Sequence, residues 1–276
     1  MNFGIIIIGD EILSGKRADK HLTKAIELLS ARGLQLAYAD YVGDEPDRIT
    51  SVLKRAFVSG DVVFSFGGIG ATPDDHTRQC AARALERELV LHPKAEQLIR
   101  ERMQDIAREQ GAAYEPERND NVYRLNMGVF PFGAHIIPNP FNKIPGFFCS
   151  GGSDAHLVRE RGGIFFLPGF PVMAHPMMAW ALDTYFGHLF VHGGWVENSV
   201  IVFGAMEATL TPLMQTIERD HAVKVFSLPS VDHPEYGRHI ELGVKGDPQA
   251  VAPAYAALLS GLNGCAAKLG PELVRS

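Results

Sequence analysis

The first strand-like segment of the chain contains no polar side chain. Residues 3–9 read FGIIIIG and are followed directly by Asp10 and Glu11. A strand of this kind has both faces covered, which is typical of the interior of a parallel sheet packed between helices. We therefore expect an α/β fold in which a buried first strand brings two acidic residues to one edge of the sheet.

The segments that follow alternate between helix-like and strand-like patterns. Apolar residues recur at helical spacing after the first loop, with Gly33 as a stop, and apolar stretches at 34–42 and 61–66 predict further strands. This alternation predicts a three-layer α/β/α domain with a mostly parallel sheet. A helix is expected at 93–110 and an exposed loop at 111–124.

The pattern changes after residue 190. Residues 199–262 show the order β-α-β-β-α, which is typical of a small α+β module. We therefore expect two domains, an α/β/α domain over 1–190 and a small α+β domain over 191–276.

The net charge and the cysteine content indicate which binding partners and which cellular compartment to expect. With 26 basic and 32 acidic residues the formal net charge is −6, so we expect no nucleic acid and no membrane as partner. The 3 cysteines are widely spaced; we expect them to be buried and free, as in a cytoplasmic protein. No apolar run reaches about 18 residues, and none has the flanks of a signal peptide.

Two common nucleotide-binding motifs do not fit. The segment GDEILSGK, residues 9–16, follows a buried strand as a phosphate loop does. A Walker A motif has four residues between its glycines and ends in Lys-Ser or Lys-Thr, whereas five residues intervene here and Arg17 follows the lysine. Gly68-x-Gly70 also lacks the third glycine of a dinucleotide fingerprint, because Pro73 stands there.

Glycine and acidic residues recur where the predicted parallel strands end. They read GDE (9–11), VGDE (42–45), GGIGATPDD (67–75) and LPGFP (167–171). Ligands of parallel sheets bind at this edge, so we expect one shared ligand site.

The glycine-rich segment at the third strand exit predicts an anion site. Thr72 has the residue type of an N-cap and Pro73 that of a first helical residue, so GGIGA is expected to lead straight into a helix N-terminus. Asp74 and Asp75 would fill the first turn, where they either complement the helix dipole or act on a ligand.

Acidic residues gathered at one site require a cation. Two like charges about 4 Å apart repel by about 4 kcal/mol at an effective dielectric constant of 20. If Asp10, Asp44 and Asp75 all face a phosphate, a divalent ion such as Mg²⁺ between them turns this repulsion into attraction. We expect such a metal to arrive with the substrate rather than to be caged permanently by the protein.

The motifs GDEILSG, VGDE and GGIGATPDDHT resemble those of the MoaB/Mog-type molybdenum-cofactor domain, also called the molybdopterin-binding domain. The match continues through Lys94, Asn139 and LPGFP, and it covers residues 3 to about 180. It resembles most closely the version in the competence/damage-inducible CinA family and in the N-terminal part of eukaryotic FAD synthase. The segment after residue 190 resembles the small KH-type domain of CinA proteins. The amidohydrolase domain of full-length CinA has no counterpart in these residues.

The resemblance implies that the loop from Gly67 to Thr72 receives a phosphate group and that Asp44 and Asp75 carry the chemistry. In CinA relatives this domain is associated with metal-dependent hydrolysis of ADP-ribose or related dinucleotide pyrophosphates, and we consider Mg²⁺, Co²⁺ and Mn²⁺ as metals. In the Mog branch it binds or adenylylates molybdopterin. Two hypotheses therefore stay open: a pyrophosphohydrolase, and a protein that binds or adenylylates a molybdopterin-like or nucleotide ligand. We also expect a homo-oligomer.

The candidate site residues all lie at or near the strand exits. The catalytic candidates are Asp44 and Asp75, and the metal candidates are Asp10, Asp44 and Asp75. The candidates for binding the ligand or its phosphate are Gly9, Asp10, Glu11, Ser14, Asp19, Gly67, Gly68, Gly70, Ala71, Thr72, Asp74, Pro168 and Gly169. The sequence departs from the family pattern where Ala71 replaces a proline, Asp19-Lys20-His21 replaces Asp-Thr-Asn, and Val172-Met173 replaces a glutamate.

Overall fold

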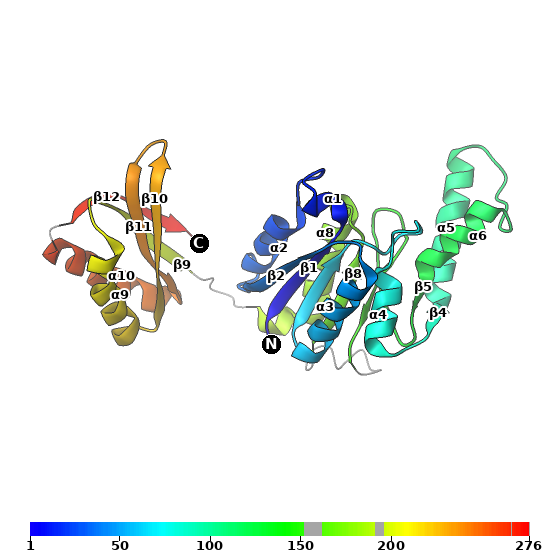
Figure 1. Cartoon of the computed structure of the whole chain (residues 1–276), viewed down its shortest axis with the longest axis horizontal. Coiled ribbons are helices and arrows are strands. Elements are labelled where there is room, and N and C mark those ends of the chain that lie inside the picture. The colour runs from blue at the N-terminus through cyan, green and yellow to red at the C-terminus, as the bar shows by residue number, and fades with distance from the viewer. Residues whose placement is uncertain (152–161, 191–195, 266, 276) are drawn as a thin grey trace. The chain divides into compact units, whose positions relative to one another are not determined.

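The computed structural model describes residues 1–151, 162–190, 196–265 and 267–275. The chain divides into two compact units, Met1–Phe190 and Val191–Ser276. Figure 1 shows the helices and strands of each unit.

The N-terminal unit is built on a 6-stranded sheet with the order β2-β1-β3-β8-β7-β6. The strands are β1 (Phe3–Ile8), β2 (Leu36–Val42), β3 (Val62–Phe66), β6 (His135–Ile137), β7 (Gly146–Cys149) and β8 (Gly163–Leu167). β1, β2, β3 and β8 run parallel, whereas β7 and β6 are antiparallel to their neighbours. Every residue of β1 is buried, so the apolar run is a strand covered on both faces.

Helices cover both faces of this sheet, as Figure 1 shows. Ile5 and Ile7 of β1 pack on one side in a core that includes residues of α2 (His21–Ser30) and α8 (Pro171–Tyr185). Ile6 and Ile8 pack on the other side in a core with α3 (Pro46–Ser59) and α4 (Thr77–Leu85). The alternation of side chains along the strand thus produces the predicted three-layer α/β/α architecture.

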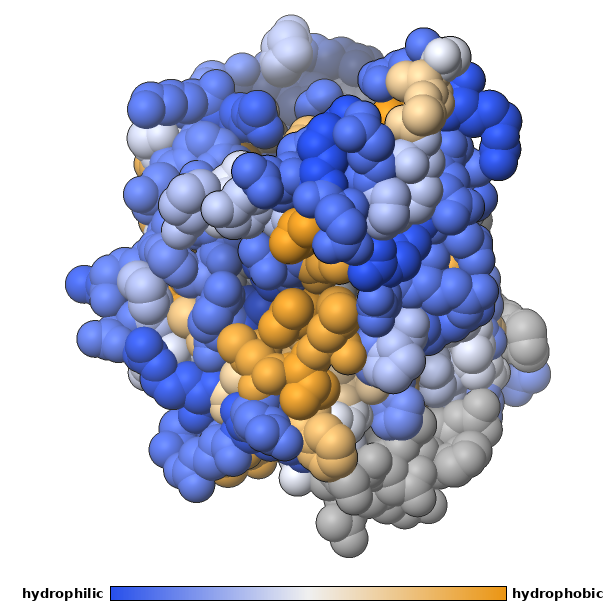
Figure 2. All heavy atoms as spheres, turned by 90° about the vertical axis from the view of Figure 1, so that its right-hand side faces the viewer, coloured by the Kyte–Doolittle hydropathy of each residue, from blue (hydrophilic) through white to orange (hydrophobic). Residues whose placement is uncertain are grey.

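The remaining elements in the described part of this unit lie around the sheet. They are α1 (Asp10–Leu13), β4 (Leu89–Leu91), α5 (Pro93–Glu109), α6 (Asn119–Arg124), β5 (Val129–Pro131) and two short 3₁₀ helices, η1 (Leu125–Gly128) and η3 (Gly187–Leu189). β4 and β5 form an antiparallel pair, and exposed Leu89 and Leu91 lie on β4. Figure 2 shows apolar side chains gathered on the face of the unit that carries α5, α6, β4 and β5.

The expectation of an exposed loop over 111–124 holds for residues 111–118, which are mostly exposed, but α6 corrects it for residues 119–124. The segment is polar, but Asn121 is buried and its side-chain Nδ2 donates to the Glu115 carbonyl at 2.7 Å. This contact stabilises a helical turn that the polar composition does not indicate.

The start of α4 corrects a second expectation. The helix begins at Thr77 with His76 in the N-cap position, not at Pro73 after Thr72. Thr72 and Asp75 form a turn instead, because Asp75 Oδ2 accepts hydrogen bonds from Thr72 N at 2.9 Å and from Thr72 Oγ1 at 2.6 Å. Hydrogen bonds of this local kind compete with helix formation. The helix N-terminus therefore lies beyond the acidic turn rather than directly after the glycine loop.

The C-terminal unit contains a 4-stranded antiparallel sheet with the order β10-β11-β9-β12 and two helices. Its elements are β9 (Val196–Phe203), α9 (Glu207–Asp220), β10 (Val223–His233), β11 (Gly237–Gly246), α10 (Pro248–Gly264) and β12 (Lys268–Arg275). The sequence did not indicate β12, because Gly270 and Pro271 interrupt its pattern and its register with β9 shifts there.

The cysteines are partly as expected. Cys80 and Cys149 are buried and free, whereas Cys265 is free but exposed, directly after α10. None of the helices in the described ranges is long and apolar enough to cross a membrane.

Candidate ligand-binding site

The strand exits of the N-terminal unit surround a cavity of about 410 Å³. Its wall contains these residues predicted from the sequence: Glu11, Gly68, Gly70, Ala71, Thr72, Asp75, Pro168 and Gly169. The structure therefore brings together the loops after β1, β3 and β8, which are far apart in the chain.

Hydrogen bonds from behind fix the glycine loop after β3. Gly67 N donates to the Leu167 carbonyl at 3.0 Å, and Thr77 donates twice, from N to the Gly68 carbonyl and from Oγ1 to the Gly67 carbonyl, each at 3.0 Å. Gly68 has φ 68°, and a Cβ there would lie 2.1 Å from Thr77 Oγ1. Only glycine allows this backbone conformation and this close approach.

The same loop also contains backbone donors without a described acceptor. The N–H groups of Gly68, Ile69, Gly70 and Ala71 donate no hydrogen bond to any residue that the structure describes, and all four residues line the cavity. Successive free amides in a tight loop bind anions such as phosphate. These amides belong to a loop rather than to a helix N-terminus, and anion binding by them stays a prediction.

Arg78 lies behind this loop and was not among the predicted residues. Its side chain is 4% exposed, and Nη2 donates to the Gly70 carbonyl at 2.6 Å while Nη1 donates to the Asn126 carbonyl. Among the described residues it has no ion-pair partner. Burial lowers the pKa of this guanidinium, and Asp75 opposes the shift. A buried positive charge here favours an anion on the other side of the loop.

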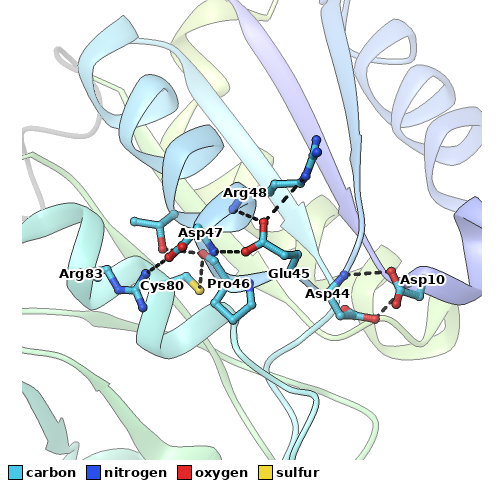
Figure 3. A network of polar contacts seen from close by, with 9 residues as sticks. Asp10, Asp44, Glu45, Pro46, Asp47, Arg48, Cys80 and Arg83 are labelled. Atoms are coloured by element: carbon cyan, nitrogen blue, oxygen red, sulfur yellow. Dashed lines mark hydrogen bonds and ion pairs between the residues drawn. The ribbon is translucent and has the colours of Figure 1, made fainter.

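Asp10 and Asp44 form a reciprocal pair at the ends of β1 and β2. Asp10 N donates to Asp44 Oδ2 at 2.9 Å, and Asp44 N donates to Asp10 Oδ1 at 3.1 Å, as Figure 3 shows. Burial raises the pKa of Asp44, and the negative charges of Asp10, Glu11 and Asp74 raise it further. Asp44 is therefore surrounded by acids and would gain from a nearby cation.

The three predicted metal ligands do not line one cavity. Asp75 faces the cavity described above, whereas Asp10 lines a separate surface hollow with Tyr41 and Arg48, and Asp44 lines neither. The reciprocal hydrogen bonds explain this, because each turns a carboxylate toward the other residue's amide. Over the ranges that the structure covers, no group of three or more His, Cys, Asp and Glu residues is arranged to hold a metal ion.

The donor set of the Asp10–Asp44 pair nevertheless fits a hard cation. Each carboxylate uses one oxygen in the pair, and carboxylate oxygens are the ligands that Mg²⁺ prefers. Two such ligands are too few for a complete site, so an ion here would take its remaining ligands from phosphate oxygens and water. A metal at this position stays a prediction.

Several predicted residues have local structural roles. Asp19 lies just before α2, where Oδ1 accepts from His21 N at 2.7 Å and Oδ2 accepts from Leu22 N at 3.0 Å and Tyr41 Oη at 2.8 Å. The following predicted residues line neither the main cavity nor its neighbour: Gly9, Ser14, Asp19, Gly67 and Asp74.

A second cavity of about 280 Å³ adjoins the first. Glu11, Arg17, Gly169 and Phe170 line both. The second is largely apolar, with Ile12, Phe66 and Pro171 in its wall beside His21 and Lys20. Arg17, His21 and Phe170 were not among the predicted site residues. Arg17 directly follows GDEILSGK and Phe170 lies within LPGFP, which is the signal that could have indicated them.

The fold is an α/β/α domain with a cavity at the carboxyl ends of its parallel strands, the edge at which ligands of such sheets bind. The sequence model for the probable molybdopterin-binding domain matches residues 4–188. The chain therefore belongs to the family of probable molybdopterin-binding domains.

The relatives of the chain confirm the resemblance to CinA. A CinA-like protein of Syntrophotalea carbinolica is 32% identical over 173 residues, which is 62% of this chain and 37% of that protein. A CinA-like protein of Geotalea uraniireducens is 28% identical over 252 residues, which is 91% of this chain and 55% of that protein. The chain thus spans only part of the length of these curated relatives.

A solved structure supports the fold. The protein CinA of Thermoplasma acidophilum, described as having unknown function, matches 67% of this chain and 98% of its own length with a TM-score of 0.53. At 24% sequence identity this likeness concerns the fold alone.

Proposed function

We propose that this chain binds a nucleotide or pterin through its phosphate groups and that it hydrolyses the pyrophosphate bond of ADP-ribose or a related dinucleotide with the help of a divalent metal. The observation that carries the proposal is the row of free amides from Gly68 to Ala71 in the wall of the cavity. Backbone donors of this kind recognise phosphate oxygens without regard to the rest of the ligand.

The size and the charge of the site support a ligand larger than a single phosphate. The main cavity of about 410 Å³ falls in the range of small-molecule sites, and an apolar cavity adjoins it. Buried Arg78 behind the loop and exposed Arg17 in the wall add positive charge where the phosphates would lie.

Hydrolysis of ADP-ribose adds one water molecule across the phosphoanhydride and gives AMP and ribose 5-phosphate. The glycine loop would hold one phosphate and stabilise the negative charge that grows on its oxygens. Asp75, which lines the same cavity, would orient the attacking water and accept its proton. A divalent ion held in part by Asp10 and Asp44 would supply further charge neutralisation.

The test is incubation of the purified protein with ADP-ribose and with FAD, each with and without Mg²⁺, Co²⁺ or Mn²⁺. We expect metal-dependent release of AMP, and we expect Asp75→Asn to lower the rate at least about 100-fold because a positioned acid–base group typically contributes that much. Asp47→Asn is the matched control, since Asp47 is an exposed acid of α3 that ion-pairs with Arg83 and lines neither cavity.

The outcome also separates the two open hypotheses. Tight binding of a nucleotide or of molybdopterin without any product would contradict the hydrolase and favour a binding protein. Formation of an adenylylated pterin from ATP would favour the adenylylating role. The absence of both binding and product with every metal would contradict the phosphate site itself.

A further inference from the structure

His21 is a buried residue with an unused hydrogen-bonding atom in the wall of the second cavity. It begins α2, it is 5% exposed, and its Nδ1 has no hydrogen-bond partner among the residues that the structure covers. A buried polar atom without a partner is unfavourable, so such atoms are rare unless a ligand or water satisfies them.

The rest of the His21 ring is held in place. Its face stacks on Phe66 with ring centroids 4.4 Å apart and an interplanar angle of 18°, and Nε2 lies 3.2 Å from the Gly169 carbonyl oxygen. Because a carbonyl only accepts, Nε2 carries the proton in this contact. The neutral ring then presents Nδ1 as an acceptor. Burial lowers the pKa of His21, which agrees with a neutral ring.

Other groups around Nδ1 do not satisfy it. The His175 ring stands nearly perpendicular, with centroids 5.3 Å apart, and its own Nε2 is also buried without a partner within the described ranges. The carboxylate of Asp19 accepts from the His21 backbone N–H rather than from the ring. Within the described ranges Nδ1 therefore keeps room for a hydrogen-bond donor, which a ligand in the second cavity could supply.

The neighbouring side chains suit a flat apolar group. Phe170 is 57% exposed although it lines both cavities, and Ile12 and Phe66 form apolar walls. An exposed aromatic side chain at the border of two cavities can stack on a planar ring. A ligand with phosphate on the glycine loop would therefore extend past Phe170 into the second cavity.

We propose that the second cavity receives the planar ring of the ligand and that His21 selects rings with an exocyclic amino group, which donates to Nδ1. This inference rests on the proposed function, since the same ligand places its phosphate on the glycine loop. Aminopurines and pterins both carry such an amino group. The proposal therefore covers both kinds of ring, and the experiment distinguishes between them.

The test compares ring compounds without phosphate, by calorimetry at one pH and without divalent metal. The probes are adenosine, purine riboside (which lacks the amino group), and a simple pterin, with inorganic pyrophosphate as the probe of the glycine loop. We expect the wild-type protein to bind adenosine or the pterin at least about tenfold more tightly than purine riboside, because a site built to pair a donor rejects the analogue without it.

Two substitutions separate the ring nitrogens. In His21→Gln the side-chain amide nitrogen can replace Nε2 and donate to the Gly169 carbonyl, but no acceptor remains at the position of Nδ1. In His21→Asn an acceptor stays near Nδ1 while the contact to Gly169 is lost. We expect His21→Gln to lose the preference for amino compounds and to bind pyrophosphate as the wild type does, and His21→Asn to keep the preference.

The results that overturn the inference are specific. Equal binding of adenosine, the pterin and purine riboside by the wild-type protein would do so without any variant, and so would an unchanged preference in His21→Gln. Pyrophosphate binding with no ring binding would overturn the inference and leave the proposed function standing. Ring binding that depends on His21, with neither pyrophosphate binding nor hydrolysis, would overturn the proposed function and leave this inference standing.

Discussion

The loops after β1 and β3 meet at one edge of the sheet but are built in different ways. The loop after β3 is held from behind by its neighbouring helix: Thr77 and Arg78 of α4 donate to its carbonyls, and its amides from Gly68 to Ala71 donate to no described residue. The loop after β1 works through side chains. Asp10 Oδ1 accepts a hydrogen bond from Asp44 N, and Arg17 is exposed in the walls of both cavities.

This difference indicates two kinds of recognition. A loop whose backbone is fixed from behind is already arranged for phosphate and needs no reorganisation when the ligand binds. Exposed charged side chains must be ordered by the ligand or by an ion, which costs conformational entropy. The loop after β3 is therefore expected to set affinity for phosphate. The loop after β1 and His21, the first residue of α2, are expected to set which ligand and which metal are accepted.

The largest expected effect tests whether Arg78 holds the loop after β3. Arg78→Leu leaves the carbonyls of Gly70 and Asn126 without their buried donor, which should lower the free energy of unfolding by about 2–4 kcal/mol. Arg83→Leu is the control on the same helix, since its exposed ion pair with Asp47 is worth about 0.5 kcal/mol. Urea unfolding followed by circular dichroism measures both. Equal losses would show that the guanidinium does not support the loop.

A second substitution tests the close approach inside the same loop. Gly68 and Gly15 have nearly the same φ, 68° and 71°, but a Cβ would meet Thr77 Oγ1 at 2.1 Å in the first case and nothing within 4 Å in the second. Gly15→Ala should cost about 1 kcal/mol for the backbone conformation alone. Gly68→Ala should cost about 1–3 kcal/mol more because of the clash. It should also weaken pyrophosphate binding in calorimetry, whereas comparable losses of stability in the two variants would contradict the fixed loop.

The sequence predicted the backbone structure of these loops better than it predicted the contacts of their side chains. The buried β1, the mostly parallel direction of the strands and the glycine loop follow from local patterns, because burial on both faces and positive φ restrict residue types strongly. The partners of Asp10, Arg78 and His21 did not follow. They depend on contacts between loops that are distant in the chain, and no periodic pattern encodes those.

The start of α4 shows the same limit on a smaller scale. Thr72-Pro73 has the residue types of a helix start, yet the Thr72–Asp75 hydrogen bonds keep this segment in a turn and the helix begins at Thr77. Propensity alone gives no ranking between these two local structures, since both satisfy the same backbone donors.

A smaller effect tests the acidic pair at the end of β1. Because burial and nearby acids raise the pKa of Asp44, its ionisation costs the folded state at neutral pH. Asp44→Asn keeps an acceptor for Asp10 N, so its free energy of unfolding should equal that of the wild type within about 0.5 kcal/mol or be slightly higher. Asp44→Ala removes the acceptor and should lose about 1 kcal/mol. Thermal unfolding at pH 7 without metal measures both, and a large loss in Asp44→Asn would mean that the charge itself stabilises the fold.

The same variants sharpen the metal prediction. With pyrophosphate present, Mg²⁺ should raise the melting temperature of the wild-type protein, because a ligand that binds only the folded state stabilises it. Asp44→Asn should show a smaller Mg²⁺-dependent rise. An equal rise in both proteins would place the ion away from this pair.

The smallest expected effect is the pH dependence of stability that His21 causes. Burial lowers the pKa of His21 from its ordinary 6.5, so the unfolded chain binds a proton more readily than the folded protein as the pH falls below about 6.5. The contribution of the neutral ring to the free energy of unfolding is present above about pH 6.5 and is lost below it. The loss between pH 7 and pH 6 is at most about 0.7 kcal/mol. His21→Gln removes this titration, so its stability should fall less over that interval, as urea unfolding at the two pH values would measure. Burial also lowers the pKa of His175, so His175→Gln should reduce the pH dependence in the same direction. An unchanged pH dependence in His21→Gln would show that the ring takes up a proton equally in the folded and unfolded chain. His21 would then be positively charged in the wall of the second cavity at low pH.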